Sequence, residues 1–335
     1  MTIAFVFPGQ GAQYAGMGKQ MAAASAQARQ VFLRADEVLG FRLSRLCWDG
    51  PDDELRRTDN TQPAILATSM ACLAALQSRG VTPHLVAGLS LGEYTALVCA
   101  GAIRYEDALV VVRRRGAFMQ EAATGRRTAM AAILGLDAPA VRRICSAAAA
   151  RGVVEPSNFN SPGQIVIAGD EDAVQEGIRL AREAGAKRAV QLPVSAPFHT
   201  SLMRPAARRL SEVLVGLAIS RPTIPVVSNV TAQPVREPDD IRRLLVEQVA
   251  SPVRWDESVR AMADAGITTF VEVGPGTALS GLIRKTVPPA RVLHVEDPAS
   301  LQEAFAALQV FPGDVAERDV GHAAPAPKGA GDGSA

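Results

Sequence analysis

The chain has 335 residues, of which 48% are hydrophobic, so it can form one large domain or two around a sizeable core. Its 35 basic and 34 acidic residues leave a formal net charge of +1, which excludes recruitment of nucleic acid or an anionic membrane by a global field. Only four of the basic residues are lysine, so an arginine indicates function here only when a motif surrounds it.

Short runs of β-branched and apolar residues alternate with helical patterns, which predicts an α/β fold. The predicted strands are 3–7, 85–89, 130–134, 165–168, 190–194, 226–229, 270–273 and 292–295. Between about 128 and 195 the order is strand, helix (137–151), strand (153–160), strand, helix (171–185), strand, which is typical of a ferredoxin-like unit. We therefore expect an α/β-hydrolase-like large subdomain with a parallel sheet (1–127 and 196–312) and an inserted ferredoxin-like small subdomain (128–195).

Neither the two ends of the chain nor the cysteines indicate a catalytic or binding site. Residues 313–335 are rich in Ala, Pro, Gly and Asp, which predicts a disordered tail. No basic leader precedes the first strand, and the longest other apolar stretch, 63–76, falls short of the roughly 20 residues of a membrane span, so we expect a cytoplasmic protein without a signal peptide. The cysteines lack CxxC spacing and are expected to be buried thiols, namely Cys47, Cys72, Cys99 and Cys145.

A GxSxG pattern at 88–92 is the strongest local signal for chemistry. It stands between a predicted strand and a helical pattern, as a nucleophile elbow does, with Ser90 as the nucleophile. The N–H of Leu91 would then face a developing oxyanion. The alternative is a Gly-Ser turn that simply closes the strand.

A serine nucleophile needs a base, and the chain offers four histidines. His322 lies in the predicted tail, His294 lies within a predicted strand, and His84 precedes the elbow strand at its far end. His199 follows the predicted insert in a loop, where catalytic groups concentrate. Its position makes it the candidate base, although no acid between Ser90 and His199 stands out as a third member of a triad.

The segment FPGQGAQ (7–13) follows the first predicted strand. Two glycines around Gln10 indicate a backbone that approaches a ligand closely, with the Gln10 N–H able to donate to an oxyanion. Neither GxGxxG nor GxxxxGK[ST] spacing is present, which disfavours nucleotide binding.

Six separated segments occur in the order found in one family: FPGQGAQ (7–13), GLSLGEY (88–94), RGAFMQEA (115–122), NFNSPGQIVIAG (158–169), PFHT (197–200) and EQVASPVRW (247–255). Together they resemble the malonyl-CoA:acyl carrier protein transacylases and the related acyltransferase domains of polyketide synthases. The resemblance runs from Met1 to about Glu296 and leaves out only the tail.

The resemblance implies a role for each matching position. Ser90 is the acyl-accepting serine and His199 the general base, while the N–H groups of Gln10 and Leu91 form the oxyanion hole. Gln248 matches the residue whose carbonyl orients the histidine. A backbone group in place of a carboxylate would explain the missing acid.

Arg115 matches the residue that holds the free carboxylate of the malonyl group. A guanidinium suits that task because it forms a bidentate, charge-assisted pair with a carboxylate. On residue count alone, Arg113, Arg114 and Arg115 are better explained as solvated side chains, and the position in the motif reverses this for Arg115 only. Phe198 matches the malonyl-selective pattern, whereas Leu89 departs from the family, which most often has histidine there.

The expected activity is therefore transfer of malonyl from malonyl-CoA to the phosphopantetheine thiol of an acyl carrier protein, with no metal or redox cofactor. Carrier proteins are acidic, and the candidate docking residues share positive charge: Arg204, Arg208, Arg209, Arg284 and Lys285. Solvated helix faces explain these five residues equally well. Two rivals remain, an editing thioester hydrolase with the same Ser-His dyad and a silent carrier-binding module. We expect a monomer that serves fatty-acid or polyketide synthesis.

Overall fold

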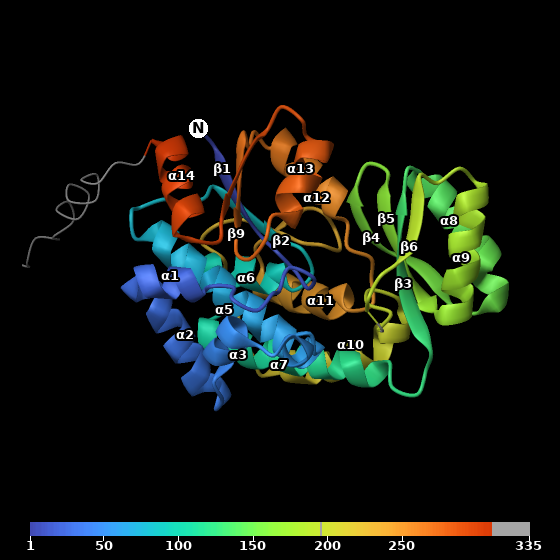
Figure 1. Ribbon diagram of the computed structural model, residues 1–335, viewed down its shortest axis with the longest axis horizontal. Helices are drawn as coiled ribbons and strands as arrows, with labels where there is room; N and C mark the ends of the chain where they lie inside the picture. Colours follow the sequence, from blue (N-terminus) through green and yellow to red (C-terminus); the bar gives the residue numbers. More distant parts are fainter. Residues whose placement is uncertain (195, 310–335) are drawn as a thin grey trace, which may run out of the picture.

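The computed structural model describes residues 1–194 and 196–309. Two sheets divide the described chain, one central in the molecule and one at its side (Figure 1). The predicted tail, with His322, lies outside the described residues, as do 195 and 310–312 near the predicted subdomain limits.

The larger sheet has six strands in the order β10-β9-β1-β2-β7-β8, and neighbours run parallel except for the antiparallel pair β7 and β8. The strands are β1 (Ile3–Phe7), β2 (Leu85–Gly88), β7 (Val226–Val227), β8 (Pro234–Val235), β9 (Thr269–Val273) and β10 (Arg291–Val295).

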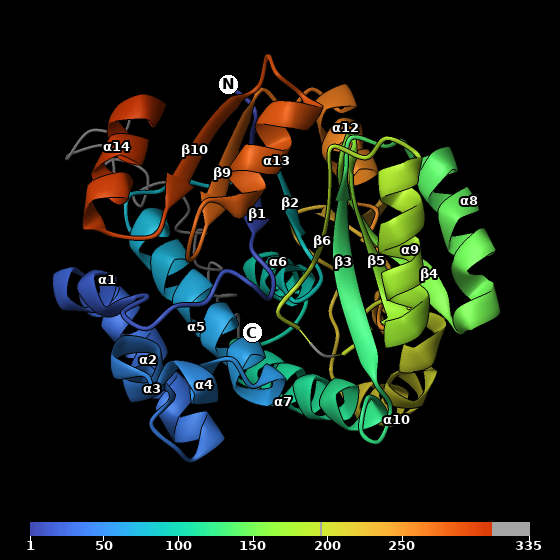
Figure 2. The same cartoon turned by 45° about the vertical axis from the view of Figure 1, so that its right-hand side comes forward.

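Both faces of the sheet are buried at its central strands, which explains why β1 and β2 are apolar without interruption. In β1, Ile3, Phe5 and Phe7 join the core on one face, whereas Ala4 and Val6 join the core on the other. Successive side chains of a strand point to opposite faces, so one apolar run serves two helical layers. The helices α12 and α13 lie over one face and α5, α6 and α7 over the other (Figures 1 and 2).

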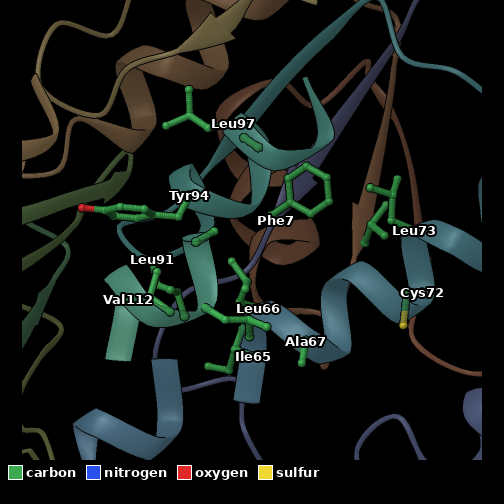
Figure 3. Packing of buried hydrophobic residues seen from close by; sticks show 14 of the residues in the cluster. Phe7, Ile65, Leu66, Ala67, Cys72, Leu73, Leu91, Tyr94, Leu97 and Val112 are labelled. Atoms are coloured by element: carbon green, nitrogen blue, oxygen red, sulfur yellow. The ribbon is translucent and has the colours of Figure 1, made fainter. Parts of the chain in front are cut away.

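The helices of this part are α1 (Lys19–Ala24), α2 (Ala26–Leu39), α3 (Leu43–Asp49), α4 (Asp52–Leu55), α5 (Thr58–Gln77), α6 (Gly92–Cys99), α7 (Tyr105–Ala122), α10 (Arg204–Val215), α11 (Pro238–Gln248), α12 (Trp255–Asp264), α13 (Ala278–Thr286) and α14 (Pro298–Leu308). Helix α5 is buried along nearly its whole length, and α6 packs between it and the sheet. Figure 3 shows Phe7, Leu66, Leu91 and Tyr94 together in this core.

The second sheet is antiparallel with the order β4-β5-β3-β6. Its elements are β3 (Thr128–Leu134), α8 (Ala138–Ala148), the 3₁₀ turn η1 (Ala149–Arg151), β4 (Val154–Ser161), β5 (Gln164–Asp170), α9 (Glu171–Glu183) and β6 (Arg188–Gln191). The βαββαβ order with a β3–β6 central-to-edge pair is the ferredoxin-like arrangement. The predicted fold class is confirmed, and the exact subdomain limits stay a prediction.

The small sheet uses both faces. Helices α8 and α9 cover one face with a core of their own. On the other face Met130, Val166 and Ala168 pack with Phe198, the residue before His199. Strand β4 also joins the large part, because Phe159 N donates to Val253 O at 2.8 Å. The small sheet therefore contacts the large part both at the residue before His199 and at Val253.

Local patterns predicted the strands well, with one omission. The strand 3–7 agrees with β1 at both ends, and the others overlap their observed counterparts, but β8 has only two residues and was not predicted. All four cysteines are free, and Cys99 is only partly buried, which corrects the prediction that every thiol is buried. Among the described helices none combines the length and apolarity that crossing a membrane requires.

Candidate active site

The GxSxG pattern forms a strand-turn-helix elbow between β2 and α6. Ser90 adopts a positive φ of 54°, a backbone conformation that residues other than glycine rarely adopt. A Cβ at Gly92 would lie 2.1 Å from the carbonyl oxygen of Phe7, and one at Gly88 would lie 1.9 Å from the Gly92 carbonyl carbon. Both glycines are therefore required by close backbone approach, and the elbow is more than a turn that closes a strand.

Three neighbouring strands deliver the site's residues at one edge of the large sheet. Gln10 follows β1, Ser90 follows β2, and Asn229 lies two residues after β7. The carboxyl ends of adjacent parallel strands meet at one edge, where α/β proteins place their ligands. Asn229 Oδ1 accepts from Ser90 N at 2.6 Å, and its Nδ2 donates to Gly88 O at 2.7 Å. The side chain thus holds the elbow on both sides of the serine.

His199 lies against the serine hydroxyl, with its Nε2 at 2.7 Å from Ser90 Oγ. Its Nδ1 lies 2.8 Å from the backbone oxygen of Gln248, the last residue of α11. A carbonyl oxygen can only accept, so Nδ1 carries the ring proton and Nε2 is free to accept the proton of Ser90. The carbonyl occupies the place that a triad acid would take.

The environment keeps this imidazole neutral. Burial lowers the pKa of His199 from 6.5 to about 4, and the nearby positive charge of Arg115 acts in the same direction. At neutral pH the ring is therefore in the form that a general base requires.

Arg115 of α7 reaches the same hydroxyl from a fully buried position, with 1% of its surface exposed. Its Nη2 donates to Ser90 Oγ at 3.1 Å and to Gln248 Oε1 at 2.9 Å, and its Nη1 donates to Gln62 Oε1 at 2.8 Å. All three acceptors are neutral, and burial lowers the pKa of Arg115. Within the described residues no carboxylate forms an ion pair with this guanidinium.

Two backbone N–H groups of segments that meet at the elbow are available to a ligand. In the described part of the chain neither the N–H of Gln10 nor that of Leu91 has a hydrogen-bond acceptor. A Cβ at Gly9 would lie 2.4 Å from the Leu89 carbonyl oxygen, so the segment after β1 packs directly on the elbow. Two unpaired donors beside a nucleophile can bind an oxyanion.

Three residues at the site were not identified from the sequence: Gln62, Glu93 and Asn229. Glu93 is 2% exposed, and its Oε2 accepts from Gln248 Nε2 at 2.7 Å and from Asn229 N at 3.1 Å. A carboxylate in the apolar stretch that begins α6 was a usable signal. Gln62 and Asn229 had none, because an amide on a helix or after a strand is common.

The remaining predicted residues lie around this centre. Phe198 is half-buried between the large core and the inner face of the small sheet. Leu89, which departs from the expected motif, packs with the apolar cluster on the α12–α13 side of the sheet. His84 Nδ1 accepts from Ile3 N at 3.1 Å at the start of the sheet, and His294 lies in β10. Neither of these histidines lies at the elbow.

Comparison with known proteins agrees with this geometry. The model of the acyl transferase domain family matches residues 4–320. The malonyl CoA-acyl carrier protein transacylase of Bacillus subtilis is 46% identical over 308 residues, which cover 92% of this chain and 97% of the relative. The chain belongs to the malonyl CoA-acyl carrier protein transacylase family of acyl transferases.

Solved structures of family members superpose on the whole described fold. An acyl-carrier-protein S-malonyltransferase from Burkholderia pseudomallei 1710b is 48% identical with a TM-score of 0.89, and the match covers 91% of this chain and all of that one. A malonyl-transacylase in complex with its type II polyketide synthase acyl-carrier protein is 44% identical with a TM-score of 0.90 over 92% of this chain and 100% of its own. The resemblance to this family is thereby confirmed.

Proposed function

We propose that the protein transfers a malonyl group from malonyl-CoA to the phosphopantetheine thiol of an acyl carrier protein, through a malonyl-Ser90 intermediate. The observation that carries this proposal is the buried guanidinium of Arg115, which touches Ser90 Oγ and has only neutral partners. A buried cation without a counter-charge is costly, and an anionic substrate would supply that charge. An acetyl group would leave it unpaired.

In the first half-reaction His199 Nε2 takes the Ser90 proton while Ser90 Oγ attacks the thioester carbonyl of malonyl-CoA. The N–H groups of Gln10 and Leu91 bind the oxyanion of the tetrahedral intermediate. Its collapse breaks the C–S bond, and the CoA sulfur leaves with the proton from His199. Gln248 O holds the imidazolium through Nδ1 during this step.

Acylation also prepares Arg115 for the malonyl carboxylate. The Nη2 of Arg115 donates to Ser90 Oγ before the reaction, and an ester oxygen is a much weaker acceptor than a hydroxyl. The Nε of Arg115 also has no hydrogen-bond partner in the described residues, while Nη1 donates to Gln62. The malonyl carboxylate can then accept from Nε and Nη2 in a bidentate pair.

In the second half-reaction the carrier's thiol replaces CoA. His199 Nε2 takes the thiol proton, the thiolate attacks the malonyl ester, and Ser90 Oγ leaves with that proton. These steps use only proton and acyl transfer by residues of one chain, so they require no metal, redox cofactor or second subunit. We propose a monomeric enzyme of the cytoplasm. The pathway would be fatty-acid or polyketide biosynthesis.

The structure reduces the number of candidate docking residues for the acidic carrier. Arg209 pairs with Glu121, Arg284 donates to Val292 O, and Lys285 donates to Gln164. Arg204 and Arg208 have no side-chain partner within the described residues, and both lie on α10 just after His199. We propose that these two arginines receive the carrier.

Intact-mass analysis tests the proposed function. Wild-type protein incubated with malonyl-CoA should gain one malonyl mass, and addition of carrier protein should move that mass to the carrier. Ser90→Ala should gain no mass; persistent labelling would place the nucleophile elsewhere. Release of free malonate, with no transfer to the carrier, would support the rival hydrolase.

A further inference from the structure

The carboxylate of Glu93 is a buried hydrogen-bond acceptor at the site to which no role has been assigned. Its Oε2 accepts from Gln248 Nε2 at 2.7 Å and from Asn229 N at 3.1 Å. These donors belong to segments that are 155 and 136 residues away in the sequence. Glu93 thus connects the end of α11 and the segment after β7 to the first turn of α6.

Each of the two partners orients part of the reaction centre. The Asn229 side chain accepts from Ser90 N and donates to Gly88 O, so it holds the elbow. Gln248 accepts from His199 Nδ1 through its backbone oxygen and from Arg115 through Oε1. Movement of either partner would displace the nucleophile, the base or the guanidinium.

The carboxylate also determines which way the Gln248 amide points. Its Nε2 donates to Glu93 Oε2 and to Ser90 O at 3.0 Å, while its Oε1 accepts from Arg115. A reversed amide would face Glu93 with an oxygen and Arg115 with an N–H₂ group, which gives two repulsive contacts. An acceptor at the position of Glu93 Oε2 therefore selects one amide orientation.

We propose that Glu93 is a positioning residue for acyl transfer, which holds Ser90, His199 and Arg115 in register by fixing Asn229 and the Gln248 amide. The inference rests on the proposed function, since the register matters only if these groups act together. Glu93 touches no reacting atom. Its contribution comes from the place of its acceptor oxygen rather than from its charge.

Two conservative variants separate acceptor position from charge. In Glu93→Gln the side-chain oxygen can take the place of Oε2 and keep both hydrogen bonds, although the charge is lost. In Glu93→Asp the charge remains, but the acceptor withdraws by one methylene from Gln248 and Asn229. A misplacement of about 1 Å in a reacting group can cost about 100-fold in rate. Positioning therefore predicts a slow Asp variant and a Gln variant that retains most of the rate.

The rate of Ser90 modification by a fluorophosphonate is the primary readout, because it reports nucleophile alignment whether or not malonyl is the substrate. Malonyl loading from malonyl-CoA is measured alongside it. Glu272 offers the matched control: it is equally buried, and its carboxylate accepts from Leu279 N and Ser280 N at the start of α13. Glu272→Asp and Glu272→Gln should leave the fluorophosphonate rate unchanged in folded protein.

The expected result is a fluorophosphonate rate about 100-fold lower in Glu93→Asp than in Glu93→Gln, with both folded by circular dichroism. A Gln variant as slow as the Asp variant, or slower, would overturn the positioning role. So would an equal loss in the Glu272 pair. If wild-type protein reacts with the fluorophosphonate but accepts no malonyl, the proposed function fails while the inference about Glu93 is still tested.

Discussion

Replacement of Arg115 by alanine should reduce malonyl loading far more than acetyl loading. The guanidinium is 1% exposed and lies 3.1 Å from the Ser90 hydroxyl, so a malonyl carboxylate would meet it away from solvent. Loss of one partner from a buried charge pair costs about 3–5 kcal/mol. Because each 1.36 kcal/mol is a factor of ten, malonyl loading should fall at least about 100-fold.

Arg115 also has contacts that do not depend on the acyl group. Its removal takes a donor from Gln62, from Gln248 and from Ser90 Oγ. Those losses affect malonyl and acetyl transfer alike, so the ratio of the two initial rates is the informative quantity. Arg115→Lys is the matched control, since lysine keeps the charge but not the bidentate geometry, and its ratio should be intermediate.

The assay follows acyl-Ser90 by intact mass at early times with malonyl-CoA and acetyl-CoA in separate reactions. The expected result is a malonyl-to-acetyl ratio about 100-fold lower in Arg115→Ala than in wild-type protein. An equal loss for both acyl groups would refute the carboxylate role and leave Arg115 with a purely structural one. Unfolding of the variant is excluded by its circular dichroism spectrum.

Three further outcomes are expected. Burial raises the pKa of Glu93 from 4.5 to about 7. Between these pH values the folded state binds a proton that the unfolded state does not, so lowering the pH from 7 to 5 should stabilise the wild-type protein by about 2 kcal/mol relative to Glu93→Gln in urea unfolding. The same change in unfolding free energy for both proteins would contradict this expectation. Gly92→Ala should lower the free energy of unfolding by about 3 kcal/mol, because its Cβ would meet Phe7 O. Gly281→Ala, whose Cβ would enter open space, should not lower the unfolding free energy measured in urea. Arg204→Glu with Arg208→Glu should raise the KM for carrier protein without changing malonyl loading, and a parallel loss of loading would argue against a docking role.

Much of the fold was predictable because its signals are local. Strands buried on both faces are short apolar runs, and the βαββαβ order of the small subdomain is readable from such runs and the helical patterns between them. The elbow was predictable because its glycine pattern lies within five residues, although the atom that excludes a Cβ at Gly92 is the distant carbonyl oxygen of Phe7. Strand β8 was not predicted because its two residues begin with a proline and form no apolar run.

The site's wider hydrogen-bond network was not predictable, because it joins residues that are far apart in sequence. Asn229 is 139 residues from Ser90, and nothing in its own segment distinguishes it from a turn asparagine. The group opposite His199 Nδ1 is a backbone oxygen, which every residue has, so no residue type could reveal it. Only resemblance pointed to Gln248, and only the structure shows its side chain between Glu93 and Arg115.

That arrangement explains how a buried cation can stay available to a substrate. A direct ion pair between Glu93 and Arg115 would neutralise the guanidinium and compete with a malonyl carboxylate. Instead the Gln248 amide lies between them, with its N–H₂ group on Glu93 and its oxygen on Arg115. The amide thus gives each of the two groups a hydrogen-bond partner but leaves Arg115 without a carboxylate partner. The guanidinium of Arg115 is therefore stabilised by hydrogen bonds in the folded protein. It has no negatively charged partner, so it can select an anionic acyl group.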